Sequence, residues 1–298
     1  MLTAHHSNAN SPSGLQTIMS SNAKVEKLSG GFKFIEGPVW DRRGFLLFSD
    51  MGANAIYKWT PGGQISIFRR PGGHPNGNTL DLEGRLITAE HDRRIVRAQK
   101  DDKLTVLAER YLFKRLNSPN DVVTKSDGST YFTDPPYGIG KEKEELGFYG
   151  VYRLSSDRTL TLLTKEMVRP NGLAFSPDEK KLYVSDSENR HIRVFQVKPD
   201  GRLTNGQVFA QLEGSTGKGV PDGMKVDVQG NVYCSGPEGV WIFSLNAQLL
   251  GKIIVPEVVT NLAWGDKDYK TLYITATKGL YRIRLNIAGI QPGKPILP

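Results

Sequence analysis

Residues 171–184, NGLAFSPDEKKLYV, contain the pattern that decides the fold. An amide residue opens the stretch, a short apolar run follows, a turn rich in Pro and Asp interrupts it, and a second run of β-formers closes it. The same order returns in EGPVWDRRGFLLF (36–48), NGNTLDLEGRLIT (76–88), NDVVTKSDGSTYFT (120–133), DGMKVDVQGNVY (222–233) and NLAWGDKDYKTLYI (261–274). Successive units begin 39 to 51 residues apart, which is the spacing of β-propeller blades.

The repeat predicts an all-β protein: a single six-bladed β-propeller with four antiparallel strands in each blade. The propeller catalytic domain is expected to cover residues 23–298, and residues 1–22 to form a flexible polar leader. Because the sixth unit has room for only about three strands, Lys24–Leu28 is expected to supply its outer strand and so close the ring. Two longer connections, Pro135–Gly150 and Pro199–Pro221, are expected to be loops on one face.

Composition sets further limits. The 298 residues are 38% hydrophobic and 23% charged, as in ordinary globular proteins. The formal net charge of +8 comes from Lys and Arg scattered in small groups without interleaved aromatics, so no nucleic-acid partner is expected. No apolar run reaches 18 residues, which argues against a membrane span, and the N-terminus lacks the pattern of a secretory signal, which favours a cytoplasmic location. The single cysteine, Cys234, is expected to be a buried, inert thiol.

Each repeat opens with an oxygen-bearing side chain. Equivalent positions in a propeller are related by rotation about the central axis, so these side chains are expected to meet at one depth of the channel. Taken singly, each is more readily explained as a turn residue that caps a strand. Taken together, oxygen acceptors with two carboxylates among them would be unfavourable in a narrow tunnel without a cation. The positions are Glu36, Asn76, Asn120, Asn171, Asp222 and Asn261.

These donors predict a hard divalent cation. Carboxylate and amide oxygens suit Ca²⁺ and Mg²⁺, whereas zinc and copper sites draw on His and Cys, which this repeat position lacks. Ca²⁺ is therefore the first choice, with Mg²⁺, Mn²⁺ or Zn²⁺ as alternatives. Glu36 and Asp222 would balance the charge, and Asn120 and Asn171 would add neutral oxygens. The Asp121 carboxylate could orient a ligand amide.

Five segments carry a resemblance to a known family. They are EGPVW (36–40), NSPNDV (117–122), FTDPPYG (132–138), PNGLAFSPD (170–178) and PDGM (221–224). In this order they resemble the gluconolactonase family that includes regucalcin (senescence marker protein 30). The DPPYG segment (134–138), together with Gly77, Asn78 and Thr79, is similar to the bacterial gluconolactonases in particular.

The resemblance implies an activity and roles for individual residues. The activity is opening of a sugar lactone, glucono-1,5-lactone to gluconate. Glu36, Asn171 and Asp222 are implied metal ligands, with Asn120 either a fourth ligand or facing the substrate. Asp222 matches the catalytic carboxylate, and Arg115 matches loosely an arginine that contacts sugar hydroxyls.

The chemistry of lactone opening adds further expectations. Hydrolysis passes through a tetrahedral oxyanion, which a cation stabilises by polarising the carbonyl. Asp222 would activate a water as general base, or would only position a metal-bound water. Selectivity for a polyol ring is expected from residues above the channel. These are Asn78, Asp134 and Tyr137, followed by His74, Glu90 and His91.

Two other functions fit the same pattern. The first is a related propeller lactonase or a phosphotriesterase-like hydrolase, because the same ring and cation would serve those substrates. The second is a non-catalytic propeller used as a binding scaffold. A scaffold needs no acidic residues that converge on the axis, so Glu36 and Asp222 favour an enzyme. The partner expected from the sequence is therefore a small-molecule sugar lactone.

Overall fold

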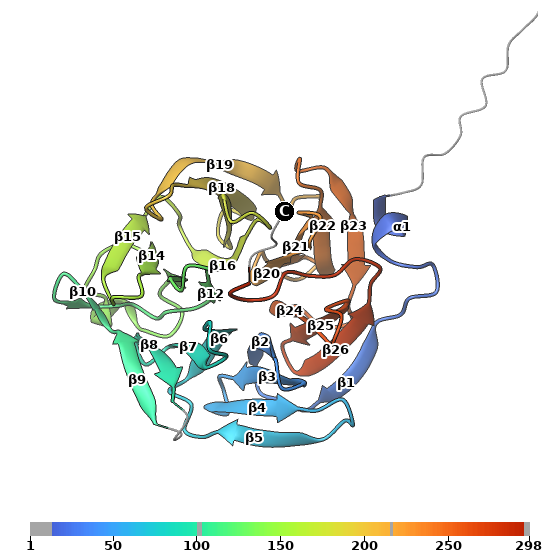
Figure 1. Ribbon diagram of the computed structural model, residues 1–298, viewed down its shortest axis with the longest axis horizontal. Coiled ribbons are helices and arrows are strands. Elements are labelled where there is room, and N and C mark those ends of the chain that lie inside the picture. Colours follow the sequence, from blue (N-terminus) through green and yellow to red (C-terminus); the bar gives the residue numbers. More distant parts are fainter. Residues whose placement is uncertain (1–13, 100–102, 215–216, 295–298) are drawn as a thin grey trace, which may run out of the picture.

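Six four-stranded antiparallel sheets form a ring around a central axis (Figure 1). The computed structural model describes residues 14–99, 103–214 and 217–294. In five of these sheets the strands follow one another in chain order from the centre outward, and in the sixth the N-terminal strand is the outermost. The innermost strands of neighbouring blades contact one another. The predicted six-bladed β-propeller is therefore confirmed.

The blades take their strands as follows. Blade 1 contains β2 (Ile35–Asp41), β3 (Phe45–Asp50), β4 (Ala55–Trp59) and β5 (Ile65–Arg69). Blade 2 contains β6 (Pro75–Leu80), β7 (Leu86–Glu90), β8 (Arg94–Ala98) and β9 (Leu104–Ala108). Blade 3 contains β12 (Val122–Thr124), β13 (Thr130–Asp134), β14 (Gly150–Leu154) and β15 (Leu160–Thr164). Blade 4 contains β16 (Pro170–Phe175), β17 (Lys181–Asp186), β18 (His191–Val197) and β19 (Leu203–Gln211). Blade 5 contains β20 (Met224–Val226), β21 (Val232–Gly236), β22 (Gly239–Phe243) and β23 (Leu249–Ile254). Blade 6 contains β24 (Asn261–Gly265), β25 (Thr271–Ala276), β26 (Gly279–Arg284) and, from the N-terminal side, β1 (Glu26–Gly30).

The N-terminal strand closes the ring. β1 pairs antiparallel with β26, and its register places Glu26 opposite Arg282. The Glu26 carboxylate also accepts a hydrogen bond from Arg282 Nε at 2.8 Å. The prediction that the N-terminal segment completes the sixth blade is confirmed, with the strand two residues further along the chain than expected. Closure leaves blade 6 with the four strands that the other blades have.

Part of the expected leader is packed against the propeller. Residues 1–13 lie outside the described residues, but α1 (Gly14–Ile18) contacts β23, and Ile18 is fully buried in the core cluster that blades 1, 5 and 6 share. The Ile18 carbonyl also accepts a hydrogen bond from the Asn286 amide at 2.8 Å. The expectation of a flexible leader is therefore wrong for residues 14–18, because burial of Ile18 stabilises this segment by roughly 1.5–3 kcal/mol.

Burial explains why these sequences form blades. The inner strands β2, β6, β16 and β24 are buried along their whole length, whereas outer strands such as β5 and β9 are largely exposed or half-buried. Aromatic rings join neighbouring blades: Trp40 of blade 1 stacks on Tyr273 of blade 6 with centroids 5.3 Å apart. Tyr131 of blade 3 meets Phe175 of blade 4 edge-on at 4.9 Å. Such pairs contribute about 0.5–1.5 kcal/mol beyond the area they bury.

The connections are only partly as expected. The segment 135–149 is a loop that contains the short 3₁₀ helix η1 (Lys141–Lys143). The second expected loop, Pro199–Pro221, instead contains β19, the outer strand of blade 4, so that expectation is wrong for residues 203–211. A small hairpin of β10 (Arg110–Tyr111) and β11 (Lys114–Arg115) lies between blades 2 and 3. None of the helices in the described part of the chain has the length and apolar character needed to cross a membrane.

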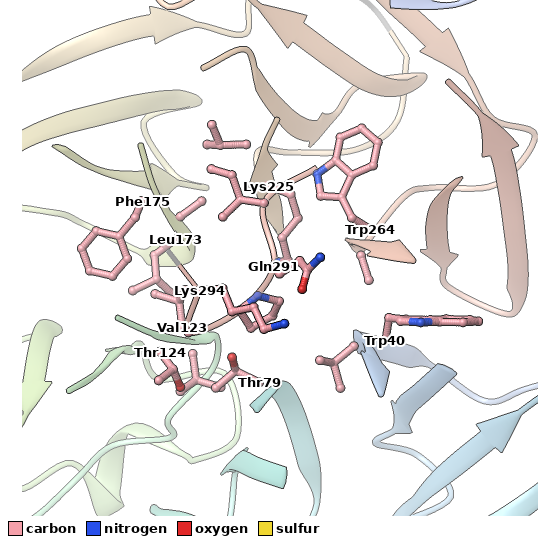
Figure 2. Close-up of a pocket in the computed structure, with 18 of the residues that line it drawn as sticks. Trp40, Thr79, Val123, Thr124, Leu173, Phe175, Lys225, Trp264, Gln291 and Lys294 are labelled. Carbon is pink, nitrogen blue, oxygen red and sulfur yellow. The ribbon is translucent and has the colours of Figure 1, made fainter. Parts of the chain in front are cut away.

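The far half of the channel is an apolar chamber of about 70 Å³ (Figure 2). Inner-strand residues such as Trp40, Leu173 and Trp264 line it, and Lys225 is its main charged wall residue on the strands. The C-terminal segment 288–294 crosses this end. Its backbone accepts a hydrogen bond from Val228 N at 2.9 Å and donates one from Gly293 N to Thr124 O at 3.3 Å. This end of the channel is therefore covered by the chain itself.

Candidate functional site

The six repeat-opening residues, called the ring residues below, lie around the axis, where five of them are buried and Asp222 is partly buried. In blades 1, 2 and 4 the register of the inner strand shifts at the ring residue, for example between Glu36 and Val39. In blades 3 and 5 the inner strand begins only two residues after Asn120 and Asp222. Such bulges and strand starts turn a side chain out of the regular alternation. The ring residues are thus free to face the channel rather than a neighbouring blade.

Glycine follows the ring residue in four blades because the inner strands approach one another closely. A Cβ at Gly77 would lie 2.6 Å from the Asn120 carbonyl oxygen. A Cβ at Gly172 would overlap the Asp222 carbonyl, and one at Gly223 would overlap the Asn261 amide. Without these glycines the ring would have to widen, so they set the distance at which the ring side chains meet.

In three blades a hydroxyl of the second strand donates a hydrogen bond to the backbone carbonyl of the ring residue in the next blade. Ser49 Oγ donates to the Asn76 carbonyl, Thr133 Oγ1 to the Asn171 carbonyl and Ser185 Oγ to the Asp222 carbonyl, each at 2.7 Å. These bonds fix the backbone of the ring and leave its side chains available to a ligand.

Three carboxylates share the floor of the ring. Glu36 is 3% exposed, and burial together with the negative charge of Asp121 raises its pKa to about 7. Burial raises the pKa of Asp222 well above its usual range, and the charges of Glu36 and Asp121 add to the effect. Hydrogen bonds offset part of this cost: Glu36 accepts from Gly37 N at 2.6 Å and Asn261 Nδ2 at 3.0 Å, and Asp121 accepts from Val122 N at 2.9 Å. Like charges held this closely favour binding of a proton or a cation.

Two ring amides present carbonyl oxygens that have no partner. Asn171 Nδ2 donates to Ser187 Oγ at 3.0 Å, and Ser187 Oγ donates to the Pro221 carbonyl at 2.6 Å. Asn76 Nδ2 bonds His91 Nε2 at 3.0 Å. The Oδ1 atoms of Asn171 and Asn76, like Oδ2 of Asp121, are buried without a hydrogen-bond partner among the described residues. Unpartnered buried acceptors are costly, so they point to a missing donor or cation.

A cavity of about 200 Å³ opens at this end of the channel. Four predicted ligands and one predicted substrate residue line it: Glu36, Asn120, Asn171, Asp222 and Tyr137. Its other polar residues are Asn76 and His91. Three apolar residues complete the wall, namely Phe34, Met51 and Val220. The structure therefore brings the predicted metal-ligand set and Tyr137 together.

Three of the predicted substrate residues lie outside this cavity. The Asn78 amide is used within the fold, because it donates to the Gly37 carbonyl and Ser49 Oγ at 2.8 Å and accepts from Thr88 Oγ1 at 2.9 Å. Arg115 lies in the β10–β11 hairpin and donates to the Asp92 carbonyl at 3.2 Å. Neither residue lines the cavity, so the structure does not place them at a substrate that binds there.

Asp134 is the third, and the repeat explains its position. It is fully buried at the end of β13, and Oδ2 accepts a hydrogen bond from Asn117 N at 2.8 Å. Asp50 and Asp186 occupy the same place in blades 1 and 4, where they accept bonds from Phe34 N at 3.1 Å and from Arg169 N at 3.0 Å. All three carboxylates anchor the segment that leads into an inner strand. Burial raises the pKa of Asp134 to about 7.

Of the three further candidates for the substrate site, His74, Glu90 and His91, one lines the cavity and two do not. His74 is exposed and pairs with Asp92 at 2.8 Å, while Glu90 is buried in ion pairs with Arg69 at 2.8 Å and Arg94 at 2.6 Å. Only His91 reaches the cavity. The Cys234 thiol is fully buried, and burial raises its pKa, as an inert thiol requires.

Sequence reasoning did not identify several residues of the site. The apolar wall residues carry no motif of their own, and Ser187, which orients Asn171, lies two residues beyond the Tyr183-Val184-Ser185 run of its strand. The recurrence of a Ser or Thr near the end of each second strand was a readable signal for the hydroxyls that bind the ring backbone. Within the described residues, no three His, Cys, Asp or Glu side chains are placed so that they could hold a metal ion by themselves. The donors here are carboxylates supplemented by amides.

These features define a class of protein: a six-bladed propeller whose channel carries acidic and amide oxygens under a small-molecule cavity. The family model described as "SMP-30/Gluconolactonase/LRE-like region" matches residues 34–278, and the chain belongs to this family. The predicted family resemblance is thereby confirmed.

Individual relatives agree with this assignment. The chain is 36% identical to a gluconolactonase of Zymomonas mobilis over 92% of this chain and 85% of the relative. It is 26% identical to a pentonolactonase of Haloferax volcanii over 82% of this chain and 81% of that protein. Among solved structures, a gluconolactonase of Xanthomonas campestris superposes with a TM-score of 0.84 at 35% identity, covering 91% of this chain and 92% of that one.

Proposed function

We propose that this protein is a cation-dependent enzyme that hydrolyses sugar lactones, with glucono-1,5-lactone opened to gluconate. The observation that carries the proposal is the convergence of Glu36 and Asp222 in one cavity with the unpartnered amide oxygen of Asn171. The nearby charge of Asp121 adds to the repulsion between the two carboxylates. Relatives named gluconolactonase and pentonolactonase, similar over most of the chain, support lactone hydrolysis as the class of reaction.

The residues present fit a hard divalent cation. Glu36 and Asp222 would supply charge, and Asn171 and Asn120 neutral oxygens; the unpartnered Oδ1 of Asn171 is the observation that favours this set. Ca²⁺ suits such donors best, followed by Mg²⁺ and Mn²⁺, with Zn²⁺ less suited because His and Cys are not among these donors. When bound, the cation supplies Lewis-acid polarisation of the lactone carbonyl.

The protein's own side chains then have distinct tasks. Asp222 accepts a proton from the attacking water, or holds that water in place by accepting its hydrogen bond. Glu36 is fixed by Asn261 and Gly37, so its carboxylate keeps one orientation. Tyr137 lies at the cavity wall with its ring 5.8 Å from the Arg169 guanidinium, where it can contact the substrate ring. When the ring C–O bond breaks, the alkoxide oxygen that leaves takes up this proton and becomes a hydroxyl group.

Two alternatives rest on the same geometry. A related lactonase or phosphotriesterase-like hydrolase would use the same floor with another substrate. A binding scaffold has no need of buried carboxylates, and their ionisation in the free protein is unfavourable. The carboxylates therefore favour an enzyme over a scaffold. The cytoplasmic location inferred from the sequence stays a prediction.

The test is hydrolysis of glucono-1,5-lactone by protein stripped with chelator and then resupplied with Ca²⁺, Mg²⁺, Mn²⁺ or Zn²⁺. Asp222→Ala is compared with Asp200→Asn, which removes an exposed turn carboxylate far from the cavity. We expect metal-restored activity in the wild type and in Asp200→Asn, and a loss of at least about 100-fold in Asp222→Ala. A metal-loaded wild type no faster than buffer would refute the assignment, and parallel assays with other lactones and a phosphotriester would identify the alternative.

A further inference from the structure

Asn76 and His91 form a pair on one wall of the cavity that the chemistry above does not use. Asn76 is the ring residue of blade 2, and His91 directly follows β7 of the same blade. Both line the cavity, and Asn76 Nδ2 lies 3.0 Å from His91 Nε2. Because the amide nitrogen can only donate, Nε2 accepts and the imidazole proton lies on Nδ1. Burial lowers the pKa of His91 to about 4, which agrees with a neutral ring.

This arrangement leaves one acceptor and one donor unused. Asn76 is 2% exposed, and its Oδ1 is buried without a partner among the described residues. His91 Nδ1 likewise has no hydrogen-bond partner in the described part of the chain. A buried acceptor without a donor costs about 1–3 kcal/mol, so the pair is incomplete until a ligand supplies hydroxyl groups.

The imidazole is held in place before any ligand arrives. His91 N donates to the His74 carbonyl at 2.9 Å, which fixes the backbone. Gly138 packs against the imidazole, since a Cβ at that position would lie 2.6 Å from His91 Cγ and 2.7 Å from Nδ1. The loop that carries Gly138 is itself anchored, because Gly138 N donates to Ser118 Oγ at 2.6 Å. A rigid donor loses little entropy when it binds a ligand.

The wall composition argues for a polyol rather than an apolar ring. Phe34, Met51 and Val220 line the cavity together with Asn76 and His91. A ligand that satisfies such a cavity presents hydroxyl groups to the polar residues and C–H groups to the apolar ones, as one ring of a sugar lactone does. A site with preformed polar partners rejects an analogue that lacks the hydroxyl.

We propose that Asn76 and His91 recognise hydroxyl groups of the lactone ring: Asn76 Oδ1 accepts a hydrogen bond from one hydroxyl, and His91 Nδ1–H donates to the same or the adjacent one. The inference rests on the proposed function and deepens it by assigning the specificity for hydroxylated lactones to this pair. The pair binds the substrate and does not bind the cation.

The test compares glucono-1,5-lactone with δ-valerolactone, a ring of the same size without hydroxyl groups. His91→Gln keeps an acceptor for Asn76 but removes the Nδ1 donor, and Asn76→Ala removes the acceptor. His74→Gln is the matched control, since His74 lies outside the cavity. For either test variant, kcat/KM for glucono-1,5-lactone is expected to fall about tenfold, mainly through KM, with δ-valerolactone changed less than about twofold. Calorimetry is expected to show an unchanged Kd for Ca²⁺ and weaker binding of gluconate.

The outcomes separate this inference from the proposed function. A wild type that hydrolyses neither lactone refutes the proposed function, and gluconate binding by wild type and His91→Gln then still tests the pair. Equal losses with both lactones, or gluconate affinity unchanged in both variants, overturn the pair's role in recognition. Weaker Ca²⁺ binding by Asn76→Ala also overturns it, because Asn76 would then act on the cation.

Discussion

Replacement of Glu36 by Gln is expected to stabilise the cation-free protein while abolishing its response to Ca²⁺. Glu36 is buried among like charges, and its pKa rises from an ordinary 4.5 to about 7. A group whose pKa is higher in the folded than in the unfolded state contributes its full stabilisation at a pH below its unfolded-state pKa. That contribution is lost as the pH rises through the folded-state pKa. Between pH 4.5 and 7 the cation-free wild type therefore loses stability that a neutral Gln retains.

The magnitude follows from the shift. A rise of about 2.5 pKa units corresponds to roughly 3 kcal/mol at pH 8, at 1.36 kcal/mol per unit. Gln can still accept the hydrogen bonds from Gly37 N and Asn261 Nδ2, so little of this gain should be lost to unpaired donors. A net gain of about 1–3 kcal/mol raises Tm by roughly 2–5 °C for a domain of this size.

The assay is differential scanning calorimetry at pH 8 and pH 5, first in chelator and then at rising Ca²⁺. In chelator at pH 8 Glu36→Gln should melt above the wild type. At pH 5 the difference should fall to about a quarter, because the folded wild-type carboxyl is then protonated. Ca²⁺ at 100 times its Kd should raise the free energy of unfolding of the wild type by about 2.7 kcal/mol, and so its Tm. The Tm of the variant should stay nearly unchanged. Glu142→Gln, an exposed 3₁₀-helix residue, serves as control. A variant that melts below the wild type in chelator at pH 8, or gains as much at pH 5, would refute the reasoning.

Two further predictions concern residues around the floor. Asp134→Ala removes the acceptor for Asn117 and is expected to lower the free energy of unfolding by about 2–4 kcal/mol, measured as a lower Tm. The Kd for Ca²⁺ should change less than about threefold. A large loss of Ca²⁺ affinity with an unchanged Tm would contradict the anchoring role. Lys225 Nζ lies 3.3 Å from Asn261 Oδ1, and the Asn261 amide donates to Glu36, so the lysine charge favours the ionised Glu36 carboxylate. Lys225→Met is therefore expected to lower the Tm of the cation-free protein at pH 8 and to tighten Ca²⁺ binding on the order of tenfold by calorimetry. Lys225→Arg should change neither.

The fold could be predicted because the repeat is written in local sequence. Each unit carries its own turn, its own inner strand and its own ring residue, and rotation about the axis then places equivalent residues at one depth. The same logic brought Glu36, Asn120, Asn171 and Asp222 into one cavity without any knowledge of long-range contacts. It also indicated that the N-terminal segment completes the last blade, since three strands would leave an exposed edge.

The substrate residues were harder to predict, because side-chain direction within a blade is not fixed by the repeat. Asn78 lies two residues after Asn76, yet its amide is used up by Gly37, Ser49 and Thr88. Asp134 and Tyr137 belong to the same DPPYG segment, but they have different roles. The Asp134 carboxylate accepts a hydrogen bond from Asn117, whereas Tyr137 lines the cavity. The order Ser-Asp or Thr-Asp at the end of β3, β13 and β17 was the signal that would have separated these roles.

The ring also explains why the channel presents one chemistry at one end and another at the other. Its backbone is fixed by hydroxyls from the preceding blade and by glycines that allow close approach, so the carboxylates cannot move apart to relieve their repulsion. Relief must come from a proton, a cation or a neighbouring positive charge. The C-terminal segment covers the opposite end of the channel, where the walls are apolar. Lys225 lines that end and donates to Asn261 Oδ1. A cation and a polar substrate are therefore expected to enter from the cavity side, where the partly exposed Tyr137 lies at the wall.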